Sequence, residues 1–351
     1  MCKPAGAGDS SCAAEPDDAR RFRNGMPSAG SAKLKILFLV QKDQRIILDR
    51  LYESVAARTE CDLRWLDSGE QANLRRYFDA NIETGRYARV VLFLRFKKEL
   101  RQRLFMRGLS NLVLLEHDAW QNYFPGKYRG KFSAHYRQLP AARVLCSGFQ
   151  VAEKLRAEGV DAVFVPKGYD QALLANRGRA RDIALGFVGS VGNDAYRRRR
   201  AMLDAIRARA PLTVTRTASG TEYADALNRI RFFISADVGM GEYMVKNFEA
   251  MACGCVLCAW DQGEAENRAL GFRDMENLVL YRDVDELLAK LSALRAAPER
   301  ADAIAAAGQA LAERAYSFAR LGARIAEALV PPLRLNSAPG FLERMRMGLR
   351  L

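Results

Sequence analysis

The sequence has 351 residues, 49% of them hydrophobic and 27% charged, so the chain is long enough to form two globular domains with large apolar cores. Lys and Arg outnumber Asp and Glu by 55 to 41, and the resulting net charge of +14 predicts an anionic partner: nucleic acid, a membrane surface or a phosphorylated substrate. No apolar run approaches the ~20 residues of a membrane-spanning helix and no hydrophobic signal segment is found, which predicts a cytoplasmic protein.

The sequence lacks the motifs of nucleic-acid readers. It contains neither aromatic residues interleaved with Lys and Arg on strands nor a helix-turn-helix or zinc-finger pattern, so we expect no nucleic acid as partner. The seven cysteines lie mostly within apolar runs, as reduced thiols that pack like small hydrophobic residues do. Cys253, Cys255 and Cys258 have no fourth ligand nearby in a chain with only two histidines, and we predict no metal site.

The first half of the chain shows the pattern of an α/β domain. Residues 1–32 are rich in Gly, Ala, Ser and Asp without apolar periodicity, which predicts a disordered leader. Within 33–166, short apolar runs alternate with helical patterns, and this alternation predicts a parallel sheet with helices on both faces, a Rossmann-like domain. Strands are expected at 34–40, 61–67, 87–95, 111–117, 142–147 and 162–165, and helices at 46–57, 72–80, 97–109 and 150–158.

A second alternation of the same kind follows in residues 167–330. The glycine-bearing, charged run 166–181 separates it from the first. Strands are expected at 183–188, 212–217, 232–237, 255–260 and 277–281, and helices at 197–209, 222–231, from about 244, and between 285 and 329. Two Rossmann-like domains would face each other across a cleft at the carboxyl ends of their strands, where α/β sheets bind ligands. Residues 331–351 form a basic amphipathic tail.

Residues 239–260 carry the clearest signal for a binding site. They combine a glycine-bearing loop, an acidic residue within that loop, an apolar-faced helix that begins at about Met244 to Asn247, and an apolar strand. A loop that ends at a helix N-terminus presents free backbone N–H groups and the positive end of the helix dipole. We therefore predict that an anion such as a diphosphate binds there.

Several motifs in register then carry a family resemblance. The block Glu249-Ala-Met-Ala-Cys-Gly254 follows the acidic glycine loop and precedes an apolar strand. The other matches are His117-Asp118, Ser147 before a helix, 166–170 (PKGYD), 187–190 (FVGS) and 271–274 (GFRD). Together they resemble group 1 glycosyltransferases of the retaining type, which have two Rossmann-like domains (the GT-B fold). The resemblance spans about residues 34–330 and implies an enzyme with a nucleotide-diphosphate sugar as donor substrate.

Glu249 and Glu242 are the acidic candidates. Glu249 lies in the first turns of the predicted helix, where a carboxylate accepts hydrogen bonds from a ribose diol, and the resemblance implies that role. The resemblance also implies that a second Glu contacts the sugar hydroxyls. Glu242, however, lies seven positions before Glu249, one short of the family's spacing, and Gly241 occupies the eighth position. Backbone N–H groups of this loop are expected to take over part of the role of Glu242.

The leaving diphosphate needs positive charge aimed at it. Many relatives have an Arg after the Gly at the end of the first strand of the second domain, but here Ser190 stands at that position. We expect Lys246, at the helix N-terminus, to act as a catalytic cation, and Arg199 in the run 197–200 to contact the donor. The remaining predicted donor contacts are Gly189, Ser190, Gly241, Tyr243, Met244, Val245 and Asn247.

His117 is the candidate from the first domain. A His at the carboxyl end of a strand can hydrogen-bond the donor sugar or orient the attacking hydroxyl, and the resemblance favours contact with the transferred sugar. The residues alone leave retention and inversion open. The resemblance implies retention by front-face attack, in which the leaving phosphate takes the proton of the acceptor. No cofactor and no metal are expected in addition to the donor.

Two basic amphipathic segments, 96–107 and 341–350, alternate Lys and Arg with apolar residues. They predict either docking on the anionic inner face of the plasma membrane or a solvated face over core packing. Docking would bring a lipid-linked acceptor to the cleft, so we predict a peripheral enzyme of cell-envelope polysaccharide, lipopolysaccharide or lipid-linked glycan biosynthesis. The alternatives are a catalytically silent scaffold with the same fold and a basic nucleic-acid-binding protein.

Overall fold

The computed structural model describes residues 33–42, 48–192 and 196–335. The predicted leader, 1–32, and the amphipathic segment 341–350 lie outside these ranges. Every helix and strand described below belongs to one unit of the chain, Leu34–Leu351.

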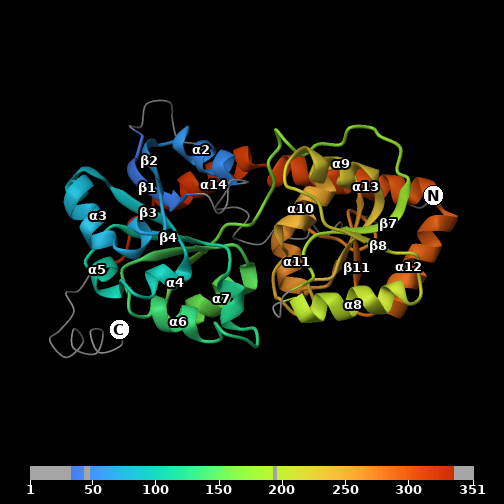
Figure 1. The fold of residues 1–351 in the computed structure, drawn as a ribbon, viewed down its shortest axis with the longest axis horizontal. Coiled ribbons are helices and arrows are strands. Elements are labelled where there is room, and N and C mark those ends of the chain that lie inside the picture. The colour runs from blue at the N-terminus through green and yellow to red at the C-terminus, as the bar shows by residue number, and fades with distance from the viewer. Residues whose placement is uncertain (1–32, 43–47, 193–195, 336–351) are drawn as a thin grey trace, which may run out of the picture. The chain divides into compact units, whose positions relative to one another are not determined.

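The first sheet has six parallel strands in the order β2-β1-β3-β4-β5-β6 (Figure 1). They are β1 (Lys35–Gln41), β2 (Glu60–Leu66), β3 (Arg89–Phe93), β4 (Leu112–Glu116), β5 (Arg143–Cys146) and β6 (Asp161–Phe164). The helices along this part of the chain are α2 (Asp49–Ala56), α3 (Leu74–Asn81), α4 (Phe96–Glu99), α5 (Arg103–Arg107), α6 (Lys131–Tyr136) and α7 (Phe149–Ala157). Strand β4 is buried throughout, because its apolar side chains meet core on both faces of the sheet.

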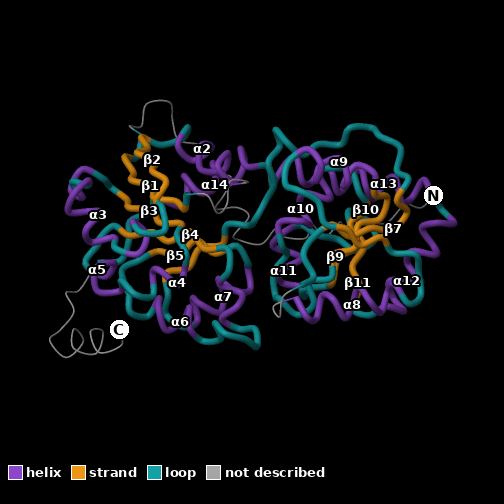
Figure 2. The backbone as a smooth tube through the Cα atoms, viewed as in Figure 1, coloured by secondary structure: helices purple, strands orange, loops and turns teal. Residues whose placement is uncertain are grey.

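The second sheet has five parallel strands in the order β11-β10-β9-β7-β8. In Figure 2 helices lie on both sides of its strands. They are β7 (Ile183–Val188), β8 (Thr213–Thr215), β9 (Ile230–Ser235), β10 (Val256–Trp260) and β11 (Val279–Tyr281). The helices are α8 (Arg197–Arg207), α9 (Thr221–Arg229), α10 (Val245–Ala252), α11 (Glu264–Leu270), α12 (Val284–Ala296), α13 (Pro298–Ala315) and α14 (Phe318–Leu329). The predicted α/β class with two Rossmann-like sheets is confirmed, and strand ends differ from their predicted positions by at most two residues.

The predicted helix 97–109 is wrong, because the segment forms two short helices, α4 and α5. Gln102 lies between them with a non-helical φ of −125°. Its side-chain Nε2 donates to the carbonyl of Gln71 at 2.6 Å, and its Oε1 accepts from the backbone N–H of Leu74. These bonds to a neighbouring segment hold Gln102 outside helical geometry.

The apolar side of the basic segment 96–107 packs into the core. The ring of Phe96 stacks on that of Phe132 with centroids 3.7 Å apart, and Met106 is fully buried. Leu104 is the one large apolar side chain of this segment that is exposed. The segment therefore fits the core-packing alternative, and its apolar residues are not displayed for a membrane. No helix in the described part of the chain is both long and apolar enough to cross a bilayer.

Helix α14 packs against the first sheet, although it follows the second along the chain. It lies beside α2, and Phe318, Leu321 and Ile325 share a buried cluster with residues of β1. Arg143 of β5 donates to the carbonyls of Ala328 and Pro331, at 3.1 and 3.0 Å. The predicted second domain, 167–330, thus contributes its last helix to the core of the first sheet.

Glu99 and His135 form a fully buried pair in the first half of the chain, with Nε2 of His135 3.6 Å from Oε2 of Glu99. Burial raises the pKa of Glu99 to about 8 and lowers the pKa of His135 to about 3. The folded state therefore keeps a proton on Glu99 that the unfolded chain releases above its ordinary pKa of 4.5. Conversely, unfolded His135 binds a proton below 6.5 that the folded state excludes.

This pair predicts a loss of stability at mildly alkaline pH. Glu99 lowers the free energy of unfolding as pH rises towards 8, because the folded state holds a proton that the unfolded chain has released. His135 has the opposite effect on that free energy, but only up to about pH 6.5, where unfolded His135 becomes neutral. Between those values the free energy of unfolding should fall by about 1.4 kcal/mol per pH unit for this one proton. Urea unfolding across the window should show this slope in the wild type and a flatter slope in Glu99→Gln. Equal slopes in the two proteins would contradict the assignment to Glu99.

Candidate functional site

Gly189 and Lys246 meet where β7 ends and α10 begins. Gly189 directly follows β7, and its N–H donates to the carbonyl of Thr215 at 2.9 Å. A Cβ at Gly189 would lie 2.6 Å from Cε of Lys246, so a larger residue there would force the lysine side chain to move. The Lys246 ammonium lies 4.5 Å from the ring centroid of Tyr223 and 3.4 Å from its hydroxyl. The cation is thus held over the Gly189 backbone at the start of α10.

Glu249 lies one turn further along α10 and belongs to the same group. The hydroxyl of Tyr223 donates to Oε2 of Glu249 at 2.5 Å. Burial raises the pKa of Glu249, while Lys246 and the Tyr223 hydroxyl oppose that rise. Burial also lowers the pKa of Lys246, and the carboxylate of Glu249 opposes that shift. Lys246, Tyr223 and Glu249 therefore form one electrostatically linked group.

Asp237, after β9, holds a second group together. Its carboxylate forms a buried ion pair with Arg199, and Asn247 Nδ2 donates to Oδ2 of Asp237 at 3.3 Å. Arg199 also donates from Nη1 to the carbonyl of Ser190 at 3.2 Å. The predicted donor residues Ser190, Arg199 and Asn247 are thus brought together, but Arg199 is only 4% exposed and its guanidinium is engaged with Asp237. In this position Arg199 fixes the loops after β7 and β9.

Glu242 lies in a third group, with Lys167 and Ser147. It forms a buried ion pair with Lys167, and Ser147 Oγ donates to its two carboxylate oxygens at 3.3 and 3.2 Å. A Cβ at Gly148 would lie 2.5 Å from Oε2 of Glu242, so the close approach requires this glycine. Burial raises the pKa of Glu242, the Lys167 ammonium opposes the rise, and the charge of Asp118 adds to it.

Met244 and Val245 mark the start of α10. Met244 is the N-cap, without a side-chain cap bond, and its Sδ lies 3.8 Å from Nζ of Lys167. Val245 is the first helical residue. The Met244 side chain therefore does not cap the first backbone N–H groups of α10. The predicted anion site requires such uncapped N–H groups.

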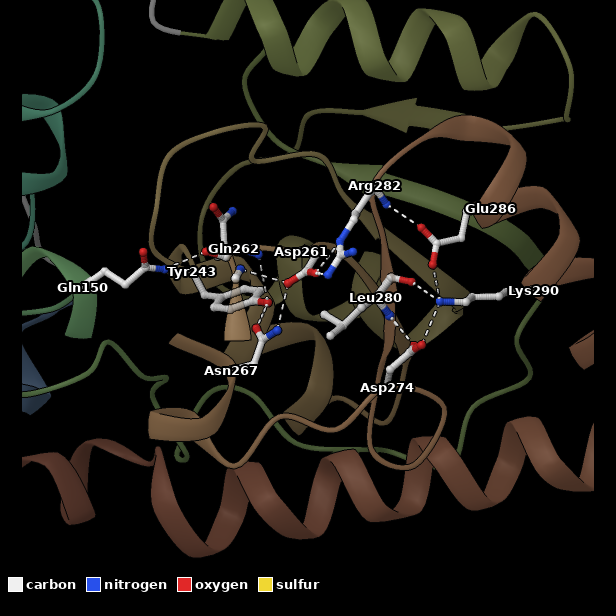
Figure 3. A network of polar contacts seen from close by, with 11 residues as sticks. Gln150, Tyr243, Asp261, Gln262, Asn267, Asp274, Leu280, Arg282, Glu286 and Lys290 are labelled. Atoms are coloured by element: carbon white, nitrogen blue, oxygen red, sulfur yellow. Dashed lines mark hydrogen bonds and ion pairs between the residues drawn. The ribbon is translucent and has the colours of Figure 1, made fainter. Parts of the chain in front are cut away.

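Gly241 and Tyr243 are held by Gln262, which follows β10 by two residues (Figure 3). The N–H of Gly241 donates to Oε1 of Gln262 at 2.9 Å, and Nε2 of Gln262 donates to the carbonyl of Asp237 at 2.8 Å. The buried hydroxyl of Tyr243 donates to Oδ1 of Asn267 in α11. This network fixes the glycine loop, but it also leaves the side chain of Tyr243 turned to the protein interior.

His117 directly follows β4 and is 4% exposed. Its ring makes an edge contact with Phe93, with centroids 5.1 Å apart. Glu116 is engaged elsewhere, since it accepts from the hydroxyl of Tyr136 at 3.3 Å. Asp118, next in sequence, is close enough to raise the pKa of Glu242, so the carboxyl end of β4 lies near the Glu242 group.

Helix α11 adds a contact that the sequence did not predict. Glu266, fully buried, accepts from the N–H groups of Phe149 and Gln150 at 3.2 and 2.9 Å, at the start of α7. Gln150 Nε2 donates to the carbonyl of Gln262 at 2.7 Å. Together with Glu242, this carboxylate joins the segment after β5 to the loops of the second sheet.

Comparisons with known proteins decide the identity of the fold. Residues 171–327 match the family model described as Glycosyl transferase-like. The HepE protein of Anabaena, solved in complex with UDP and glucose, matches with a TM-score of 0.64 at 13% identity, over 84% of this chain and 99% of that one. A sucrose-phosphate synthase from Thermosynechococcus elongatus matches with a TM-score of 0.60 at 12% identity, over 84% and 98% of the two chains.

The chain has the GT-B fold of glycosyltransferases, and its residues 171–327 are glycosyltransferase-like in sequence. A glycosyltransferase from Rickettsia africae matches as well, with a TM-score of 0.56 at 11% identity, over 85% of this chain and 98% of that one. Among curated proteins, no sequence matches the chain. The resemblance to group 1 glycosyltransferases, drawn from the motifs, is thus confirmed.

Four residues of the candidate site were missed by the sequence reasoning: Lys167, Tyr223, Asp237 and Gln262. Asp237 could have been found, since it ends the predicted strand 232–237 just before the glycine loop. Lys167 lies within the motif 166–170 that carried the resemblance. Tyr223 and Gln262 have no sequence signal, because only the folded chain brings them to Glu249 and Gly241.

A separate polar cavity of about 570 Å³ lies beside the ends of β10 and β11. Its charges are paired: Arg282 with Asp261, and Lys290 with Asp274 and Glu286. None of the predicted site residues lines it. Within the described ranges, no group of three or more His, Cys, Asp or Glu is placed to hold a metal ion.

Proposed function

We propose that the glycosyltransferase takes a uridine-diphosphate sugar as donor and binds it at the start of α10. One observation carries the proposal: the Lys246 ammonium is held over Gly189 at the helix N-terminus, one turn from the Glu249 carboxylate. A cation and a helix N-terminus suit the diphosphate, and a carboxylate suits the ribose diol. The HepE structures contain UDP, with glucose in one and as UDP-glucose in another, which supports uridine as the base.

The reaction proposed is transfer with retention of configuration. The bond from the anomeric carbon to the diphosphate oxygen breaks while the acceptor oxygen bonds to the same face of the sugar. The acceptor's proton passes to the leaving phosphate oxygen, so no separate base is required. Lys246 and the first N–H groups of α10 stabilise the negative charge that grows on the diphosphate. This charge balance requires no metal or cofactor, and His117 is assigned to the transferred sugar.

Glu242 is assigned a positioning role. Its carboxylate oxygens both have partners, Lys167 and Ser147, and the side chain is 1% exposed. A carboxylate held in this way fixes the loop 239–244 against the segment after β5. The one-residue departure from the family's spacing is consistent with this role.

For the acceptor, we propose a cell-envelope polysaccharide or a lipid-linked glycan, met at the inner face of the plasma membrane. The net charge of +14 supports attraction to an anionic surface. The segment 96–107 contributes charge but no apolar anchor, because Phe96 and Met106 are buried and Leu104 alone of its large apolar side chains is exposed. The alternative, a catalytically silent protein with the same fold, predicts donor binding without turnover. Mass spectrometry with a panel of sugar nucleotides distinguishes the two, since transfer or hydrolysis of any donor excludes a silent protein.

Replacing Glu249 tests the ribose assignment. Glu249→Ala should weaken UDP binding by about a hundredfold, because it removes both ribose hydrogen bonds and the partner of Lys246. Glu249→Gln keeps an oxygen for the Tyr223 hydroxyl and should lose less. Isothermal titration with UDP measures both variants, and thermal unfolding confirms that they are folded. Unchanged UDP affinity in a folded Glu249→Ala protein would refute the assignment.

A further inference from the structure

The run from residue 119 to residue 152 is free of carboxylates. It contains no Asp or Glu, and its basic residues are Lys127, Arg129, Lys131, Arg137 and Arg143. Arg143 of this run pairs with Asp161, as many arginines elsewhere in the described chain pair with carboxylates, such as Arg229 with Asp182. This run connects β4 to α7 and includes α6. A local excess of positive charge therefore lies in the segment that follows the carboxyl end of β4.

Aromatic rings in this run carry cations on their faces. Nζ of Lys127 and Nζ of Lys131 lie 5.4 and 5.8 Å from the ring centroid of Tyr128. Nζ of Lys154 lies 5.0 Å from the centroid of Tyr123. Both rings are half-buried, whereas the three lysines are exposed. The rings thus hold the ammonium groups at the surface by cation–π contact.

Phe124 lies between this surface and the glycine loop that contains Gly239. The guanidinium of Arg198, the second residue of α8, lies 4.9 Å from the Phe124 centroid. A Cβ at Gly239 would lie 2.7 Å from Nη1 of Arg198, so the same guanidinium touches the glycine loop. Met240 of that loop shares a buried cluster with Trp120. We call the rings of Tyr123, Phe124 and Tyr128 with the cations over them the basic shelf.

The cations of the basic shelf form no ion pairs in the described chain, and the carboxylate of Glu158 accepts from the hydroxyl of Tyr123 at 2.9 Å. Lys127, Lys131, Lys154 and Arg198 form no ion pair with a carboxylate anywhere in the described ranges of the chain. Four exposed and unpaired cations beside one loop attract an anion.

We propose that the basic shelf binds the acceptor and that the acceptor is an anionic saccharide, one carrying carboxylate or phosphate groups. The proposal rests on the proposed function, because it places the acceptor beside the loop 239–244 at the donor site. The half-buried rings add apolar contact area for a sugar, and the cations take its acidic groups. The large apolar side chains exposed in the described ranges, Trp65, Leu104, Val330 and Leu335, all lie outside the shelf. A surface that inserts into a membrane or stacks on nucleobases would need such side chains.

Titration of three tetrasaccharides tests this. The full chain, with and without UDP, is titrated with tetragalacturonate, with phosphorylated maltotetraose and with neutral maltotetraose, at low and at high salt. An acidic tetrasaccharide should bind at least about tenfold more tightly than the neutral one, with an advantage that shrinks as salt screens the charges. Preference for the carboxylate or the phosphate probe identifies the acidic group.

The double variant Lys127→Gln/Lys131→Gln should weaken binding of the acidic probe by about five- to tenfold. The control variant Arg137→Gln/Arg324→Gln removes the same charge from exposed sites outside the shelf. Its affinity for the acidic probe should change less than about twofold. Equal affinity for the neutral probe, or an equal loss in the control, would overturn the proposal. The proposal would also be overturned if the double variant lost affinity only for phosphatidylglycerol vesicles or duplex DNA, titrated in the same way, and kept its affinity for the acidic tetrasaccharides. Failure of UDP to bind would contradict the donor assignment instead, and the saccharide preference without UDP would still decide the role of the shelf.

Discussion

Replacing Lys167 with Met is expected to destabilise the protein by about 3–5 kcal/mol. The change leaves the Glu242 carboxylate, which is 1% exposed, with the Ser147 hydroxyl and without its ammonium partner. Urea unfolding at neutral pH measures the loss. The loss of stability should be smaller in mild acid, because Glu242 can then take up a proton. Burial already raises the pKa of Glu242.

A second substitution shows whether the unpaired charge is the cause. Lys167→Met/Glu242→Gln removes both charges and should recover more than half of the lost stability. Arg50→Met is the matched control, because it breaks the ion pair between Arg50 and Asp170. The side chain of Arg50 is 53% exposed. That pair should contribute at most about 1 kcal/mol. If Lys167→Met costs no more than Arg50→Met, the buried pair does not hold the loop 239–244.

Lys246→Met is expected to lower the rate of sugar transfer by about 10²- to 10³-fold. The ammonium stabilises charge that develops on the diphosphate in the transition state, so kcat should fall more than the affinity for UDP. Gly189→Ala should reproduce the loss, because its methyl group would lie 2.6 Å from Cε of Lys246 and displace the side chain. Initial rates with the donor found by mass spectrometry measure both variants.

Arg200→Met is the control for Lys246→Met. Arg200 belongs to the same basic run and is exposed, and its Nη1 lies 3.4 Å from the carbonyl of Val191. Its loss should change the rate less than about threefold, because an exposed charge is screened by solvent. A rate in Lys246→Met equal to that in Arg200→Met would remove Lys246 from the mechanism.

The strands and the chain region of the site could be predicted from sequence, because their signals are local. Apolar runs such as 183–188 are too short for helices, and in a parallel sheet they are buried on both faces. The start of α10 was predicted at Met244 to Asn247 because a glycine loop meets an apolar helical pattern there, and α10 begins at Val245. Helix α11 was missed, since Glu264–Leu270 is short and mostly polar.

The partners of the site residues could not be predicted, because they depend on contacts between distant segments. Arg199 was expected at the diphosphate, but Asp237 pairs with it from the end of another strand. Glu242 was expected at the sugar, but Lys167 reaches it across 75 positions of sequence. Residue type and spacing indicate which charges gather at a sheet edge, and they do not determine which charges pair.

The central claim is that α10 and Lys246 form a diphosphate site for a nucleotide sugar. Isothermal titration of the full chain with UDP and with UMP tests it most directly. UDP should bind at least about tenfold more tightly than UMP, because its second phosphate engages the helix N-terminus and the Lys246 ammonium. Equal affinities for UDP and UMP, or no binding of UDP, GDP or ADP to the folded protein, would contradict the claim.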